Sequence, residues 1–121
     1  MAYTTVLLQT ITTVEGEGLN SPSPLNLTYT VPQGCTAGVQ YVRAGNAADG
    51  MVNVTLLKDG KAMRYVPVAA GGAIHVPLAI VDELDPGTEI SVSAAGEVTG
   101  TLILDVGILE VTVSGGGDGA F

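Results

Sequence analysis

The chain has 121 residues and a formal net charge of −8. Hydrophobic residues make up 46% of it, which excludes a generally disordered chain, and the length fits one domain with a modest core. Four basic residues against twelve acidic ones exclude a strong phosphate-binding patch, so we expect no nucleic-acid partner. With one Phe, four Tyr and no Trp, the composition is poorly suited to an aromatic-lined ligand pocket.

The first 24 residues predict an extended segment followed by a loop. Residues 3–13 are rich in Thr, Val, Leu and Ile and carry no helix-start signal, so we expect a strand or an extended arm that pairs with something. Residues 14–24 collect Gly, Ser, Pro and two Glu, which predicts a mobile loop. No basic stretch followed by an apolar run is present, so no secretory signal is predicted and we expect synthesis in a cytoplasm.

The middle of the chain alternates between short strands and turns. Strands are expected at residues 25–31, 36–44, 51–57 and 62–68, because apolar and polar residues alternate there. Within 36–44, Val39 and Tyr41 are assigned to one face and Gln40 and Val42 to the other. The next turn holds Asn46 and Asp49, residue types that tolerate left-handed backbone. The Asp59-Gly60 pair is the strongest short hairpin signal in the chain.

The last third contains the clearest alternation. Pro77, within an expected strand at 73–79, predicts an edge strand or a bulge. Residues 80–85 fit a helical turn or an irregular crossover. From Leu84 to Val113, alternation on both sides of a break at 95–97 predicts an antiparallel hairpin. Gly107 suggests a bulge before residues 108–113, which either continue the strand or form a final short one.

These elements predict an all-β fold. Eight or nine short strands at a spacing of about ten residues, with no convincing helix, favour an antiparallel β-sandwich that is jelly-roll-like or an immunoglobulin-like variant. We divide the chain into an N-terminal arm or strand plus loop (1–24), the sandwich (25–113) and a flexible Gly-rich tail (114–121).

No constellation of residues indicates an enzyme. The single Cys35 and the single His75 are far apart in sequence, so we interpret them as a turn or buried thiol and as a surface or interface histidine. The acidic residues Asp82, Glu83, Asp85 and Glu89 do not match a calcium loop, and Glu15 and Glu17 lack the burial that tunes catalytic carboxylates. We therefore predict no catalytic residue, no cofactor and no metal. No apolar run is long enough to span a bilayer, so no membrane partner is expected.

The order of the segments resembles a known family. The stretch YTVPQGCTA (29–37) leads to Arg43-x-x-Asn46, and VNVTLLKDG (52–60), LDPGTEISVSAA (84–95) and GILEV (107–111) follow. This succession resembles the small β-sandwich structural proteins of tailed bacteriophages, many of which decorate a virion. The resemblance covers about residues 25–113, and residues 1–24 lie outside it. It implies a β-sandwich without enzymatic activity that assembles or binds on the particle.

The resemblance implies a head decoration (cement) protein. Such a protein lies on the capsid exterior as a homotrimer or another homo-oligomer, and it clamps neighbouring major capsid protein subunits. The negative charge fits a position outside the shell, away from DNA. We expect partner contacts in 2–13, in 14–24 and in the tail, at Tyr3, Val6, Leu8, Ile11, Leu19 and Phe121. The alternatives are a tail, baseplate or fibre-associated adaptor and a receptor- or carbohydrate-binding module.

Overall fold

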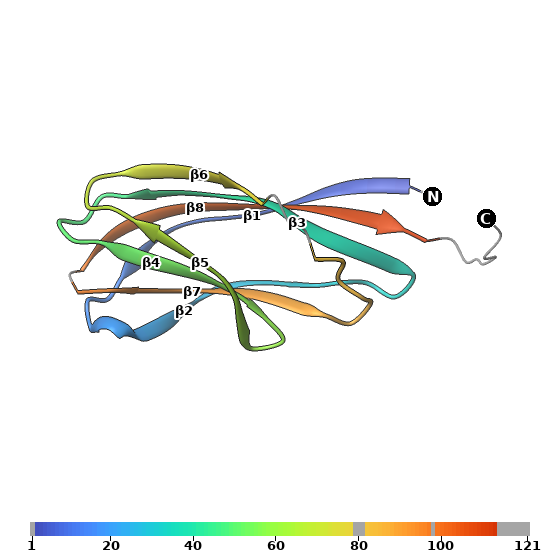
Figure 1. Cartoon of the computed structure of the whole chain (residues 1–121), viewed down its shortest axis with the longest axis horizontal. Coiled ribbons are helices and arrows are strands. Elements are labelled where there is room, and N and C mark those ends of the chain that lie inside the picture. The colour runs from blue at the N-terminus through green and yellow to red at the C-terminus, as the bar shows by residue number, and fades with distance from the viewer. Residues whose placement is uncertain (1, 79–81, 98, 114–121) are drawn as a thin grey trace.

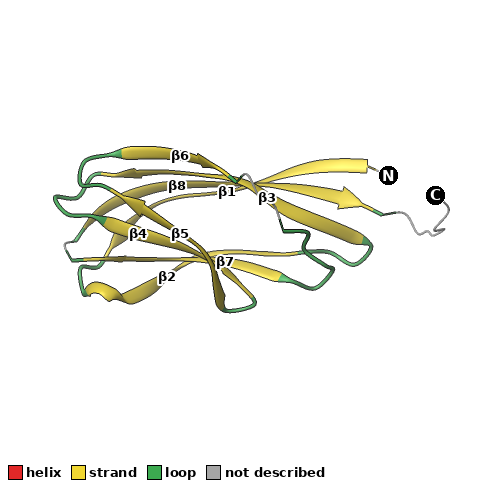
Figure 2. Cartoon of the chain, in the orientation of Figure 1, coloured by secondary structure: helices red, strands yellow, loops and turns green. Residues whose placement is uncertain are grey.

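A computed structural model describes residues 2–78, 82–97 and 99–113, and these form a two-layered antiparallel β-sandwich (Figures 1 and 2). The first sheet has the order β1 (Ala2–Val14), β8 (Gly100–Thr112), β3 (Cys35–Asn46) and β6 (Ala73–Pro77). The second sheet has the order β2 (Gly18–Thr30), β7 (Glu89–Gly96), β4 (Val52–Lys58) and β5 (Lys61–Val68). The predicted all-β sandwich is confirmed, with eight strands among the described residues.

The strand order is that of a jelly roll. Only β4 and β5 are neighbours both in sequence and within a sheet, and the Asp59-Gly60 turn joins them as predicted. Both turn residues have positive φ, 50° at Asp59 and 82° at Gly60, which is the backbone that a two-residue hairpin requires. The Asp59 side chain also accepts a hydrogen bond from the backbone N–H of Glu89 at 2.9 Å, so the hairpin tip is fixed to the start of β7.

The prediction that residues 84–113 form an antiparallel hairpin with a break at 95–97 is wrong. β7 and β8 lie in different sheets, and β7 is hydrogen-bonded on both of its edges, to β2 and to β4. The connection from Gly96 to Gly100 therefore crosses from one layer to the other. Two packed sheets lie about 10 Å apart, a distance that a few extended residues can span. Alternation identified both strands but could not identify their partners.

The core lies between the two sheets and is aliphatic. Its largest fully buried side chains are Leu56, Leu84, Ile90, Leu102, Leu104, Ile108, Val14, Val31, Val42, Val52, Val54 and Val68. Leu84 belongs to the segment 80–85, predicted as a helical turn or an irregular crossover, of which residues 80 and 81 lie outside the described residues. It pairs with Ala37 through two backbone hydrogen bonds, so this part of the connection adds an isolated bridge to β3.

The N-terminal residues belong to both sheets. β1 pairs with β8 along its whole length, from Ala2 with Thr112 to Val14 with Gly100. The predicted loop at 14–24 is wrong in extent, because β2 begins at Gly18 and only Glu15 to Glu17 form the turn. β2 is irregular, with register shifts between Gly18 and Ser23 and between Pro24 and Thr28. Its prolines are tolerated because β2 is an edge strand.

A bulge on β3 corrects the predicted faces of this strand. Val39 pairs with Ile108 and Tyr41 pairs with Gly107, which leaves Gln40 as the extra residue. Val39 and Val42 are therefore both buried in the core, whereas Tyr41 lies on the outer face. The bulge occurs on the strand opposite Gly107, and β8 itself runs through without interruption to Thr112.

The end of β3 is held by a buried side chain. The Asn46 amide nitrogen donates to the carbonyl oxygens of Gly50, Val68 and Ala69, and its oxygen accepts from the Ala48 N–H. Neither Asn46 nor Asp49 has a positive φ, so neither adopts the left-handed backbone that its residue type tolerates. Asn46 instead stabilises the turn through the hydrogen bonds of its side chain. β6 is an edge strand, which was one of the two alternatives predicted from Pro77, and it ends at Pro77 within the expected range 73–79. The tail at 114–121 lies outside the described residues, and no helix that could cross a membrane occurs within them.

Candidate interaction surface

The outer faces of the two sheets differ in chemistry. On the first sheet, alternate residues of β1 and β8 point away from the core, because Leu102, Leu104, Val106 and Ile108 occupy the inner face. Outward residues include six apolar side chains that we call the apolar face: Tyr3, Leu7, Ile11, Ile103, Leu109 and Val111. Ile11 is 72% exposed and Ile103 is 51% exposed. Exposed aliphatic side chains grouped in this way are typical of a contact surface.

The register places these side chains in cross-strand rows. Tyr3 pairs with Val111, Thr5 with Leu109, and Ile11 with Ile103. Side chains of directly opposed residues touch on one face of a sheet. The apolar face is therefore a band that runs along β1 and β8. It is interrupted at one row by Gln9 and Asp105, the latter lying 3.8 Å from Arg43.

The outer face of the second sheet is polar. The rows there place Thr28 beside Ser91, and Ser93 beside Thr55. Its exposed large hydrophobic residue is Tyr65, on edge strand β5, which is 68% exposed. These rows carry small hydroxyl side chains, of which Thr55 and Ser93 are buried. Among the described residues this face therefore shows no band of exposed apolar side chains comparable to that on the first sheet.

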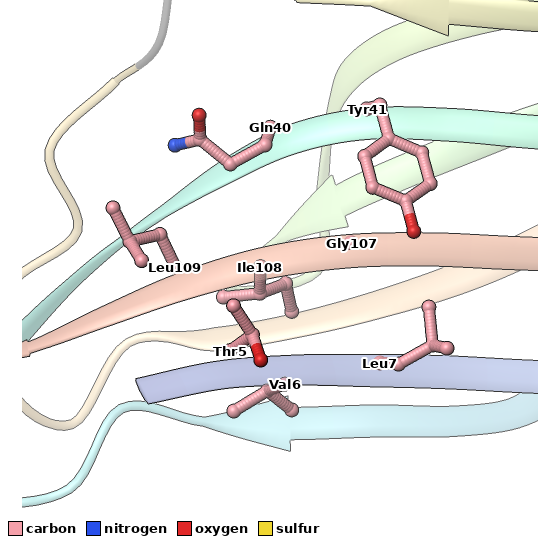
Figure 3. Close-up of a pocket in the computed structure, with 8 residues that line it drawn as sticks. All are labelled: Thr5, Val6, Leu7, Gln40, Tyr41, Gly107, Ile108 and Leu109. Atoms are coloured by element: carbon pink, nitrogen blue, oxygen red, sulfur yellow. The ribbon is translucent and has the colours of Figure 1, made fainter. Parts of the chain in front are cut away.

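A groove interrupts the apolar face where β8 has no side chain. It has a volume of about 380 Å³ and is lined by Thr5, Val6, Leu7, Gln40, Tyr41, Gly107, Ile108 and Leu109 (Figure 3). The Tyr41 side chain extends from β3 over Gly107, so that a Cβ at residue 107 would lie 2.1 Å from the Tyr41 ring. The ring meets His75 of β6 edge to face, with centroids 5.2 Å apart.

One polar contact joins the two sheets near the edge of the core. The Tyr29 hydroxyl on β2 donates a hydrogen bond of 2.7 Å to Glu110 on β8. Burial, followed by this hydrogen bond and by the charge of Glu110, raises the pKa of Tyr29 well above its usual range. This contact is structural, because an acid of such high pKa stays protonated and has no role as a proton donor near neutral pH.

The reactive side chains do not meet. Cys35 is buried at the start of β3, with its sulfur 3.9 Å from the Thr112 hydroxyl. His75 pairs with Arg43, eight positions further along β3, which corresponds to about 26 Å. Asp82, Glu83, Asp85 and Glu89 are exposed, as are Glu15 and Glu17, and within the described ranges no three metal-ligating side chains are grouped.

The described residues among those expected to contact a partner do not all lie on one surface. Tyr3 and Ile11 lie on the apolar face, whereas Val6 and Leu8 point inward and are half-buried against the core. Leu19 lies at the end of the sandwich near Met51, Asp49 and Glu97. Phe121 lies outside the described residues.

Sequence reasoning missed five residues of this surface: Leu7, Tyr41, Ile103, Leu109 and Val111. Leu7 and Leu8 are adjacent and equally apolar, so alternation alone does not show which one faces outward. Ile103 and Leu109 were assigned to a scaffold hairpin. The one available signal was that β8 carries apolar residues at both odd and even positions, which indicates a strand covered on both faces.

No protein-family model and no curated protein matches the sequence. Solved structures do match the fold. A protein of the Bacillus endospore appendages, described as disulfide-linked pili, has 14% identity and a TM-score of 0.55, and the match covers 93% of this chain and 89% of that one. The VP2 subviral particle of infectious bursal disease virus has 13% identity and a TM-score of 0.52, over 98% of this chain and 34% of VP2.

A protein named PirA matches with 13% identity and a TM-score of 0.53, over 82% of this chain and 91% of that one. At such identities the likeness shows a shared β-sandwich fold alone. The same fold therefore occurs in a pilus protein and in a viral particle, and the apolar face must carry the functional argument for this chain.

Proposed function

We propose that the protein is a non-enzymatic structural protein of a virus particle, a head decoration (cement) protein that binds the outside of the capsid. The apolar face carries this proposal. On a chain of charge −8, it joins exposed tyrosine and aliphatic side chains over two adjacent strands. Apolar contact with the major capsid protein would be favourable there, while the remaining acidic surface stays in solvent.

The fold supports the proposal by supplying rigidity. β1 and β8 are paired over thirteen consecutive positions, so the apolar face needs no ordering when a partner binds. Copies that each bind weakly at neighbouring capsid sites would together stabilise the shell, because linked sites raise the overall affinity. The pilus and viral-particle proteins that share this fold are consistent with such an assembly role.

The test uses expanded capsids that lack the protein. Purified wild-type protein is expected to bind them saturably, as measured by cosedimentation and by imaging of the particles. An Ile103→Glu variant places a charge in the Ile11–Ile103 row of the apolar face and is expected to weaken binding at least about ten-fold, the effect of roughly 1.4 kcal/mol. Tyr65→Glu is the matched control, because Tyr65 is also an exposed large hydrophobic residue but lies on the second sheet.

If Ile103→Glu leaves binding unchanged and Tyr65→Glu abolishes it, the contact lies on the second sheet. That result would contradict the proposal. Absence of wild-type binding would also contradict it. Deletion of residues 2–13 is unsuitable as a test, because it removes β1 and exposes the β8 edge and the core.

A further inference from the structure

The free edge of β1 differs from the other three sheet edges. The edge strands are β1 and β6 in the first sheet and β2 and β5 in the second. An unpaired edge offers backbone N–H and C=O groups to any other strand, and proteins block such edges with prolines, charges, bulges or short strands. Whether each edge is blocked can be read from its sequence and register.

Three of these edges are blocked. β2 contains Pro22 and Pro24, two register shifts and Asn26 with a φ of 59°. β5 carries Lys61 and Pro67 and is irregular opposite Leu56 and Leu57. β6 has five residues and ends at Pro77.

β1 carries none of these features. It has 13 residues, AYTTVLLQTITTV, without a proline, a glycine or a charged side chain. It pairs with β8 throughout, and no other described strand pairs with its second edge. On a chain with twelve acidic residues, an uncharged stretch of this length also limits the repulsion between two copies that approach through it.

The sequence of β1 is complementary to itself when it is reversed. In an antiparallel pair of two β1 strands centred on Leu7, Leu7 opposes Leu7 of the second copy. Outward from this centre the opposed pairs are Val6 with Leu8, Thr5 with Gln9, Thr4 with Thr10, and Tyr3 with Ile11. Within residues 3–11 every apolar residue thus meets an apolar one, and every polar residue meets a polar one, while Ala2 lies opposite Thr12.

Other registers lose this match. If one strand shifts by one residue, its outward side chains lie opposite the core-facing side chains of the other strand. If it shifts by two residues, the pair is centred on Val6 or on Leu8. The first of these registers opposes Thr5 with Leu7, and the second opposes Thr5 with Ile11. The register on Leu7 is therefore favoured over its neighbours.

We propose that two copies of the protein associate through their β1 edges, antiparallel and with Leu7 opposite Leu7, as a two-fold symmetric dimer. Such a contact is closed, because both copies use the same patch. It joins the two first sheets into one continuous sheet and brings the outward Tyr3, Leu7 and Ile11 of both copies together. It also covers the half-buried Val6 and Leu8 at the sandwich edge.

The dimer does not depend on the capsid proposal, and its test uses the purified protein alone. Sedimentation of the full-length chain at increasing concentration is expected to show a monomer–dimer equilibrium. Register is tested by oxidative cross-linking in a Cys35→Ala background, which removes the native thiol. Leu7→Cys is expected to cross-link, because opposed Cα atoms in an antiparallel pair lie about 4.5–5.5 Å apart, within disulfide range.

Gln9→Cys is the matched control for register. Two copies of residue 9 would be four positions apart along the strands, about 13 Å, which is too far for a disulfide. An equimolar mixture of Gln9→Cys and Thr5→Cys proteins is expected to form the mixed dimer instead. Cross-linking of Gln9→Cys alone, as efficient as that of Leu7→Cys, would overturn the register.

A charge exchange tests the edge contact itself. The double variant Thr5→Lys/Gln9→Lys places like charges opposite each other twice and is expected to weaken dimerisation at least about ten-fold. Mixing it with Thr5→Glu/Gln9→Glu is expected to restore a dimer made of both variants. Both positions are exposed, so the thermal unfolding of Thr5→Lys/Gln9→Lys alone should match the wild type. Thr5→Glu/Gln9→Glu places a carboxylate opposite Asp105 and is expected to unfold at a slightly lower temperature.

A protein that remains monomeric at every concentration overturns the proposal. A dimer that survives Thr5→Lys/Gln9→Lys but is lost in Ile103→Glu also overturns it, because the contact would then be the apolar face of β8. Since Ile103 lies away from the β1 edge, dimerisation of Ile103→Glu with loss of capsid binding would separate the two proposals.

Discussion

Gly107 shows how one residue shapes the candidate surface. The ring of Tyr41 covers it, so a methyl group at position 107 would lie 2.1 Å from a ring carbon. The missing side chain makes room for this ring, and both residues line the groove beside β1. The Tyr41 ring and the bulge at Gln40 form the wall on the β3 side.

We predict that Gly107→Ala lowers the free energy of unfolding by about 1–3 kcal/mol, because the Tyr41 ring must be displaced. The measurement is urea unfolding of the wild type, of both single variants and of Gly107→Ala/Tyr41→Ala. In the Tyr41→Ala background the glycine substitution is expected to cost close to nothing. An equal cost in both backgrounds would show that the ring is not the reason for glycine at this position.

Tyr29 provides a prediction about pH. Its pKa is raised in the folded state by burial, by its hydrogen bond to Glu110 and by the charge of that residue. A group whose pKa is raised on folding stabilises the protein below its unfolded pKa, about 10 for tyrosine, and this contribution is lost as the pH rises beyond that value.

We therefore expect Tyr29→Phe to lower the free energy of unfolding at pH 7 by about 1 kcal/mol, the net value of such a hydrogen bond. The effect stays this small because the pair is only part-buried and water screens it. The difference between the two proteins should shrink between pH 10 and pH 11. A difference that stays constant or grows over this range would contradict the assigned cause.

At the scale of elements, strand positions could be predicted from the sequence, and strand partners largely could not. The expected strands at 36–44, 51–57 and 62–68 agree with β3, β4 and β5 to within a few residues. The Asp59-Gly60 hairpin was predictable because its signal is local: two adjacent residues adopt positive φ. The pairing of β7 and β8 was not, because a short connection suits both a hairpin and a crossover between layers.

The bulge at Gln40 illustrates a second limit of local patterns. Strict alternation places Val39 and Tyr41 on one face, but one extra residue reverses the assignment after it. No pattern within residues 36–44 predicts this bulge. It is decided by the packing of Tyr41 over a glycine of another strand, which is 66 positions later in the chain.

At the scale of the whole molecule, net charge should control self-association. Each copy carries a formal charge of −8, so two copies repel each other while they approach through the uncharged β1. Salt screens this repulsion, with a Debye length of about 10 Å at 0.1 M and about 3 Å at 1 M.

We predict that the dissociation constant of the dimer falls as NaCl is raised from about 0.02 M to about 0.5 M, a range over which the Debye length shortens several-fold. Sedimentation equilibrium at several salt concentrations measures this. A dissociation constant that rises with salt would indicate a contact made by opposite charges, which β1 does not contain.

The sequence by itself determined the fold class, most strand positions and the Asp59-Gly60 hairpin, because each depends on neighbouring residues or on composition. It also contained the self-complementary order of β1. Only the tertiary structure decided which face of β1 points outward, that β7 and β8 belong to different sheets, and that three edges are blocked while β1 is open. These features depend on which strands compete for each edge, and that competition is settled by the packing of the whole core.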